Sequence, residues 1–281
     1  MFSSKPFVFV IGESQTEFLV HAGIIAKQSK ALDVLINGPM AEASGGKAIL
    51  DDVQTDTFER FCQFAYTGNY TTPASRLVED SPPINKRKKG TIKPFDSEAV
   101  PEPEVSDESW DSTPPSEKSK RTVEILRFRY SLRELLGSLH YKTGKTTLVT
   151  ELCDVRYNSS VREDYTPIFL GHAHLYVFAD KWGVTGLKNL ALSKLHQTLL
   201  HFTLYDARRP DIVELVRYAY DNTPDRVGAV DELRELLTVY MGCEAESMVR
   251  CSEFLSLIGE GGKIPQDFVQ MTVKRIQITK G

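Results

Sequence analysis

One stretch of the sequence has the residue types of a phosphate-binding loop. Residues 143–146 read Thr-Gly-Lys-Thr and match the end of the nucleotide-binding pattern G-x-x-x-x-G-K-[ST]. That pattern needs a further glycine at the position of Leu139, whereas the nearest one is Gly137. The loop must also follow a strand, so that backbone amides at the start of a helix converge on the phosphate. Here a helix is expected before it, and the sequence therefore argues against nucleotide hydrolysis.

Histidine and cysteine are the other residue types that could bind a metal or act as a nucleophile. His172 and His174 stand two apart in an expected helix, while His196 and His201 stand five apart, so neither pair forms the i, i+4 clamp of a helical metal site. The cysteines lack a C-x-x-C pair, which predicts buried or half-buried thiols rather than a disulfide or zinc scaffold. These cysteines are Cys62, Cys153, Cys243 and Cys251. We therefore expect no metal site, no cofactor and no catalytic site, and a protein that is not an enzyme.

Length and charge narrow the class of protein further. The chain has 281 residues, of which 41% are hydrophobic and 26% charged, as is typical of a globular protein of one or two domains. Its net charge of -4 provides no overall attraction to nucleic acid or to an anionic membrane. The apolar run Phe7–Ile11 is too short for a signal-peptide core or a membrane span. These features predict an intracellular protein, cytoplasmic or nuclear, with no direct contact with nucleic acid or membrane.

A proline-rich stretch at residues 72–120 has few apolar residues, so it cannot build a core and predicts a disordered insertion at residues 73–121. It contains one basic run, which consists of Lys86, Arg87, Lys88 and Lys89. An exposed, extended basic run is what a nuclear import signal requires, so these four residues are candidates for one. The alternative is solvated charge that balances the acidic block after them.

The elements that surround this stretch follow from hydrophobic spacing. Phe7–Ile11 and Glu17–Val20 flank a turn and predict a hairpin, and Lys47–Leu50 predicts a third strand. Helices are expected at residues 22–28, after Ser29, which can cap the next helix, and from Thr55 or Asp56 onward.

The later part of the chain has helical spacing almost throughout. Val123–Leu139 predicts an amphipathic helix, within a linking segment at residues 122–166. Further helices are expected at residues 168–181, 186–199, 211–220, 231–246, 248–257 and 265–276. The sequence therefore predicts an α+β fold, a short three-stranded sheet with helices, followed by an all-helical C-terminal region.

Several short motifs stand in a distinctive order within residues 7–70. A strand pair leads into the pattern His-x-x-x-Ile-Ala-x-x-Ser from His21 to Ser29. An Asp-Val pair at residues 52–53 precedes the next helix, which ends in Tyr-Thr-Gly at residues 66–68. This order resembles the BTB/POZ domain, and residues 174–182 and 187–191 look like the closing helix pair of the same domain. The whole arrangement is similar to BTB-domain proteins of filamentous fungi.

The resemblance implies a BTB domain in two parts, at residues 5–72 and 167–202, with helical residues 203–281 after it. BTB domains are interaction modules, of which many dimerise and some bind a cullin scaffold and present a substrate for ubiquitination. In the cullin-binding members a hydrophobic-x-acidic element follows the first helix pair, and Met40 and Glu42 stand at the matching place. Packing of Met40 on the core, beside a solvated Glu42, is the alternative.

We therefore expect a non-catalytic scaffold for protein interactions that is able to associate with itself. Two more specific roles stay open at this point. One is a substrate adaptor of a cullin-RING ubiquitin ligase, with Met40 and Glu42 as the cullin contact. The other is a nuclear transcriptional cofactor, imported through the basic run at residues 86–89.

Overall fold

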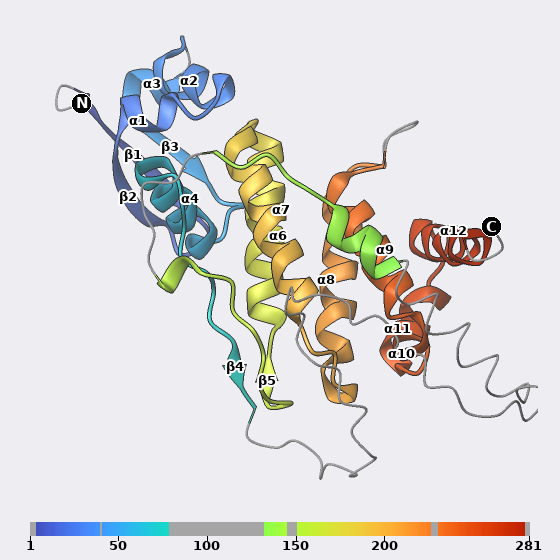
Figure 1. Ribbon diagram of the computed structural model, residues 1–281. Helices are drawn as coiled ribbons and strands as arrows, with labels where there is room; N and C mark the ends of the chain where they lie inside the picture. Colours follow the sequence, from blue (N-terminus) through green and yellow to red (C-terminus); the bar gives the residue numbers. More distant parts are fainter. Residues whose placement is uncertain (1–3, 40, 79–131, 145–150, 226–229, 279–281) are drawn as a thin grey trace, which may run out of the picture.

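The computed structural model describes residues 4–39, 41–78, 132–144, 151–225 and 230–278. The fold is mixed α+β, as the sequence predicts. A three-stranded sheet lies at one end, a pair of long helices lies in the middle, and the C-terminal helices cover the opposite side of that pair (Figure 1).

The sheet is built from β1 (Pro6–Ile11), β2 (Thr16–His21) and β3 (Lys47–Leu50) in the order β2-β1-β3. The first two strands form the predicted antiparallel hairpin, and β3 pairs with β1 in parallel. Their tight turn needs a left-handed backbone at Gly12, whose φ is +66°, a conformation that glycine adopts at little cost. Alternate side chains of β1, among them Phe7 and Phe9, enter the core.

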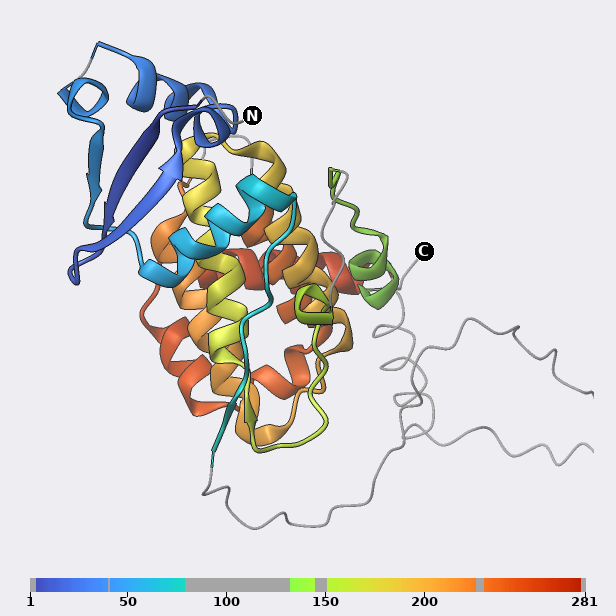
Figure 2. The same ribbon diagram turned by 90° about the vertical axis from the view of Figure 1, so that its left-hand side faces the viewer.

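Short helices surround this sheet. They are α1 (Ala22–Ala26), α2 (Lys30–Asn37), α3 (Ala41–Gly45) and α4 (Thr55–Thr67). The predicted cap of α2 is confirmed, because the Ser29 hydroxyl accepts a hydrogen bond at 3.1 Å from a backbone N–H in the first turn. Helix α4 packs on α6 of the central helix pair and lies beside the sheet (Figure 2).

The central pair consists of α6 (Thr166–Trp182) and α7 (Thr185–His201), joined by a left-handed turn at Gly183. Both helices carry buried residues on most of their circumference, because other elements pack on each side of them. Phe178 of α6 meets Phe61 of α4 with ring centroids 4.9 Å apart. The helix pair therefore joins the sheet unit to the rest of the chain.

A small ribbon corrects the predicted start of the disordered insertion. Residues 73–78, which the sequence assigns to the insertion at 73–121, are part of the described structure, and β4 (Arg76–Leu77) pairs with β5 (Glu163–Asp164). These residues are ordered because of a tertiary contact that composition does not reveal. Pro73 is buried against α6, so close to Gly171 that a Cβ on this glycine would lie 2.4 Å from the proline Cγ. The remaining residues of that prediction, 79–121, lie outside the described residues.

The C-terminal region is helical, as predicted. Its elements are the 3-10 turn η2 (Asp206–Arg208), α8 (Arg209–Asn222), α9 (Glu232–Cys243), α10 (Ala245–Met248), α11 (Ser252–Gly259) and α12 (Lys263–Ile278). The helix predicted at residues 248–257 is wrong at its start, because α10 ends at Met248 and α11 begins only at Ser252. Both Met248 and Cys251 are buried at this break, so burial produces the apolar spacing without a continuous helix.

Of the predicted helix at 123–139, residues 132–138 are described and helical, and residues 123–131 lie outside the described residues. The described part docks within the same chain, beside α9 (Figure 1). Leu132 and Leu136 are both buried. A single cluster of buried apolar side chains extends from Phe7 to Ile264 and includes this segment. Among the helices that the structure describes, none is long and apolar enough to cross a membrane.

Candidate protein-interaction surface

The outer face of the three-stranded sheet carries exposed apolar side chains. Strand alternation places Val8, which is half-buried, and Val10, which is 4% exposed, on this face of β1, and the register places Leu19 beside Val8 and Ile49 beside Val10. Leu19 is 73% exposed and Ile49 65% exposed, although both belong to regular strands of the sheet. Side chains of this kind are usually covered, and their joint exposure marks this face as a candidate interaction surface.

Opposite charges occupy the other two corners of the same face. Glu17 lies on β2 beside Val10, and Lys47 lies on β3 beside Val8. Their side chains form an ion pair of 2.8 Å that joins the two edge strands across β1. We call the four corners and the two valines between them the outer sheet face: Val8, Val10, Glu17, Leu19, Lys47 and Ile49.

Of the sequence-predicted site residues, Glu42 alone lies among the residues that the structure describes. Glu42 lies on α3, a short helix with no buried residue, which contacts α2 and β3. Met40 lies outside the described residues, and so does the whole basic run at 86–89. Of the Thr-Gly-Lys-Thr stretch, the first two residues are described and follow a helix rather than a strand.

His172 and His174 each pack against a tyrosine ring. His172 is fully buried against Tyr70. His174 faces α8, where its ring centroid lies 4.5 Å from that of Tyr218. The cysteines are buried or half-buried, as predicted. Within the described part of the chain, no three His, Cys, Asp or Glu side chains are grouped in a way that could hold a metal ion.

A buried cluster around Lys194 contains the groups with strongly shifted pKa values. The Lys194 ammonium donates to the carbonyl oxygens of Tyr70 and Cys153, each at 2.8 Å. It also lies 4.1 Å from the centroid of the Tyr70 ring, within cation–π range. Burial lowers the pKa of Lys194 to about 8, so the group is charged at neutral pH.

His172 completes this cluster. Its Nδ1 lies 2.8 Å from the Tyr70 hydroxyl, while its Nε2 has no hydrogen-bond partner among the described residues. Burial, and then the Lys194 and Arg60 cations, lower the pKa of His172 to about 3. Shifted pKa values often mark active sites. Here, however, Lys194 is only 7% exposed and His172 is 0% exposed, which leaves a substrate no access.

The Lys194 cluster therefore has a structural role, which sequence reasoning missed. Tyr70 precedes residues 79–131 in the chain, and Cys153 follows the described helix at 132–138, so one ammonium holds both flanks on α7. A signal for it exists in the sequence: Leu187, Ala191, Lys194 and Thr198 share one helical face, and lysine is the charged member of a face that is otherwise apolar or small.

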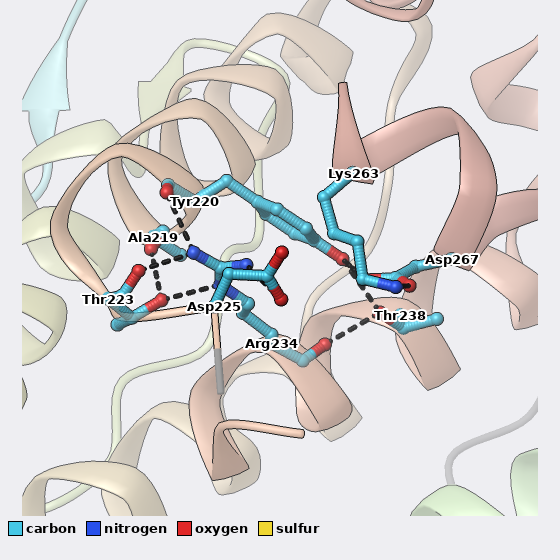
Figure 3. A network of polar contacts seen from close by, with 8 residues as sticks. All are labelled: Ala219, Tyr220, Thr223, Asp225, Arg234, Thr238, Lys263 and Asp267. Atoms are coloured by element: carbon cyan, nitrogen blue, oxygen red, sulfur yellow. Dashed lines mark hydrogen bonds and ion pairs between the residues drawn. The ribbon is translucent and has the colours of Figure 1, made fainter. Parts of the chain in front are cut away.

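A second buried cation joins the C-terminal helices. Arg234 of α9 donates to the hydroxyl of Thr223, just beyond the end of α8, at 2.7 Å (Figure 3). It also donates to the carbonyl of Tyr220, within α8, at 3.0 Å. Its guanidinium carbon lies 4.7 Å from the Tyr220 ring centroid. The Tyr220 hydroxyl donates to Asp267 of α12 at 2.9 Å. Each polar group in this network bonds another protein group, which is typical of a buried structural network.

Comparisons with known proteins add no assignment to this geometry. A scan against protein-family models finds no model that matches the chain, and a search of curated proteins finds no match.

Replacement of Lys194 by methionine tests the structural role of the cluster. We expect Lys194→Met to lower the free energy of unfolding by about 3 kcal/mol, because it removes two charge-assisted hydrogen bonds to buried carbonyls. Urea unfolding measures this, with Lys142→Met, an exposed lysine, as the matched control. Equal effects of the two substitutions would contradict the role.

The buried neutral His172 predicts a loss of stability in mild acid. An unfolded histidine has a pKa of about 6.5, so between that pH and about 3 only the unfolded state binds this proton. The free energy of unfolding must then fall as the pH falls, by up to about 1.4 kcal/mol per pH unit from this group. Between pH 7 and pH 5 we expect the free energy of unfolding to fall by about 2 kcal/mol less in His172→Gln than in the unchanged chain.

The measurement for this prediction is urea unfolding at both pH values. His201→Gln, which replaces an exposed histidine of α7, serves as the control and should keep the pH dependence of the unchanged chain. If His172→Gln and the unchanged chain lose the same amount of stability, His172 is not the group responsible.

Proposed function

We propose that the chain is a protein-interaction scaffold built on a BTB/POZ fold, that it associates with itself through the outer sheet face, and that it is not an enzyme. The element order supports the fold assignment. A β1–β2 hairpin, a short helix pair, a parallel third strand and α4 stand in the order of the resemblance, and α6 and α7 follow as a long helix pair. The single observation that carries the interaction role is the exposure of Leu19 and Ile49 on a regular sheet.

The arrangement of the four corners favours a second copy as the partner. Leu19 and Ile49 lie at one pair of opposite corners, and Glu17 and Lys47 at the other pair. A twofold axis in the plane of the face, along the line from Leu19 to Ile49, brings each apolar residue opposite its own copy. The same rotation brings Glu17 opposite Lys47 of the second copy, so the face is complementary to itself, as a twofold interface must be.

The self-association prediction is tested by charge reversal. Glu17→Lys should weaken the dimer at least about tenfold, because it sets like charges opposite each other across the interface. Combining it with Lys47→Glu should restore the dimer, since the double variant again has opposite charges at these corners. Sedimentation equilibrium measures the dissociation constants.

Leu19→Lys and Leu77→Lys are the matched pair of controls, since both leucines are 73% exposed and only Leu19 lies on the outer sheet face. We expect dissociation with Leu19→Lys and no change with Leu77→Lys. A monomeric unchanged chain, or equal effects of both substitutions, would refute this interface.

A second candidate function, substrate adaptor of a cullin-RING ligase, is favoured by the exposure of α3. None of its residues is buried, so Glu42 is accessible to a partner. This role predicts that a cullin N-terminal domain binds the chain and that Glu42→Lys weakens binding at least about tenfold through charge repulsion or a lost hydrogen bond. Calorimetry measures it, with Glu13→Lys, an exposed residue of the β1–β2 turn, as control. Absence of binding to the unchanged chain would exclude the adaptor role.

A further inference from the structure

The helical segment at residues 132–138 packs against α7, α9 and α12, and we call the surface of these helices that it covers the groove. Its Leu132 is 1% exposed and its Leu136 3% exposed. The floor of the groove beneath Leu132 is Gly242 of α9, where a Cβ would lie 3.4 Å from the leucine Cδ1 and 2.7 Å from Cγ of Met271 on α12. Glycine at this point lets a leucine of the segment approach the backbone of α9 closely.

Polar contacts fix the position of the segment at both ends. Arg133 forms an ion pair of 2.6 Å with Glu244, just past the end of α9. At the other end, Nε2 of His196 on α7 donates to the Leu136 carbonyl at 2.7 Å and so satisfies a carbonyl of the last helical turn. The side-chain amide of Asn189 donates to the Lys142 carbonyl at 2.9 Å. These contacts give the groove both a register and a direction for the helix that it holds.

The direction of the segment is antiparallel to α9. Leu132 lies at Gly242, near the end of that helix. Tyr141, at the other end of the segment, lies near the start of α9, where burial and then the carboxylates of Glu235 and Glu232 raise the pKa of its hydroxyl.

The five residues Leu-Arg-Glu-Leu-Leu occur twice in the chain, at residues 132–136 and again at 233–237 within α9. The second copy lies within the 12-residue helix α9, whereas seven described residues of the first segment, 132–138, are helical.

We propose that the groove formed by α7, α9 and α12 is a receptor for a short amphipathic helix, that residues 132–144 fill it in cis, and that a partner helix with leucines four residues apart and an arginine after the first leucine competes for it. Leucine anchors at this spacing are the usual readout of a helix in a groove. The arginine in this pattern follows from the ion pair that Arg133 forms with Glu244. This surface is separate from the outer sheet face.

The probe for the experiment is a fluorescent synthetic peptide with the sequence of residues 131–144. In the full chain with Leu132→Asp and Leu136→Asp, the cis helix loses its apolar anchors and should vacate the groove. We expect the peptide to bind this double variant at least about tenfold more tightly than the unchanged chain, where the tethered copy competes at a high effective concentration. Fluorescence anisotropy measures both affinities.

Matched controls distinguish binding in the groove from nonspecific binding of the peptide. Ser138→Asp adds a charge at an exposed position of the same segment, so a chain with this substitution should behave like the unchanged chain. A peptide with both leucines replaced by aspartate should not bind, and one with Arg133→Glu should bind at least about tenfold more weakly.

Three results would overturn the proposal. One is equal binding of the peptide to the double variant and to the unchanged chain, and another is no binding to either. The third is loss of cooperative unfolding in the double variant, which would make the segment an indispensable part of the core. Hydrogen exchange on the unchanged chain checks the same point without substitutions. Amides of residues 134–138 should exchange at least about tenfold faster than those of α9, because the helix opens locally.

A second copy as the occupant is a separate outcome of these measurements. A dimer of the unchanged chain that dissociates in the Leu132→Asp, Leu136→Asp variant would show that the helix is exchanged between copies, and would overturn the assignment to a different partner. Sensitivity of a dimer to Glu17→Lys bears only on the outer sheet face, so failure of either proposal is distinguishable from failure of the other.

Discussion

The charged amine of Lys194 is the contact on which the arrangement of the described residues most depends. It bonds the backbone at Tyr70 and at Cys153, two positions far apart in the sequence, and holds both on α7. Because a buried ammonium without partners would be strongly unfavourable, the two flanks must stay in place once α7 is packed. The closure cost of a long intervening segment grows only slowly with its length. The Lys194 ammonium thus holds together two packed elements that a long stretch of chain separates in the sequence.

The packed core held by Lys194 forms a frame, and accessible surfaces lie on two sides of it. On one side, the sheet turns Leu19 and Ile49 outward although its inner face is fully packed. On the other side, the C-terminal helices are held together by the Arg234 network and leave a groove in which residues 132–138 lie. The buried cations sit in the frame and have no access for substrate, while the accessible apolar groups lie on surfaces. Such a distribution supports the proposed role in binding to proteins.

Local patterns in the sequence predict the elements well and the contacts between them poorly. Strand β3 has the predicted bounds, and Ser29 caps α2 as expected, because alternation and capping act within a few residues. The break between Met248 and Ser252 was not predicted, because both sides of it are buried and the apolar spacing continues across it.

Long-range contacts escape sequence reasoning for a related reason. Pro73 suggests a disordered start of the insertion, yet it packs against Gly171, nearly a hundred residues later in the chain. Lys194 interrupts an apolar helical face, a signal that is visible in the sequence, but its partners are backbone carbonyls, which any residue supplies. The outer sheet face was not predicted as a site, because exposed leucine and isoleucine look like core residues until the register of the strands is known.

We infer that the described residues fold without residues 79–131, because the Lys194 contact joins the flanks of that segment. The most direct test is to replace residues 79–131 with a flexible Gly/Ser linker of about 20 residues, which spans roughly 25 Å on average, and to follow thermal unfolding by calorimetry. We predict a single cooperative transition within about 4 °C of the unchanged chain, equivalent to a change of roughly 1 kcal/mol. Loss of the cooperative transition would show that residues 79–131 are part of the folded core and would contradict the account.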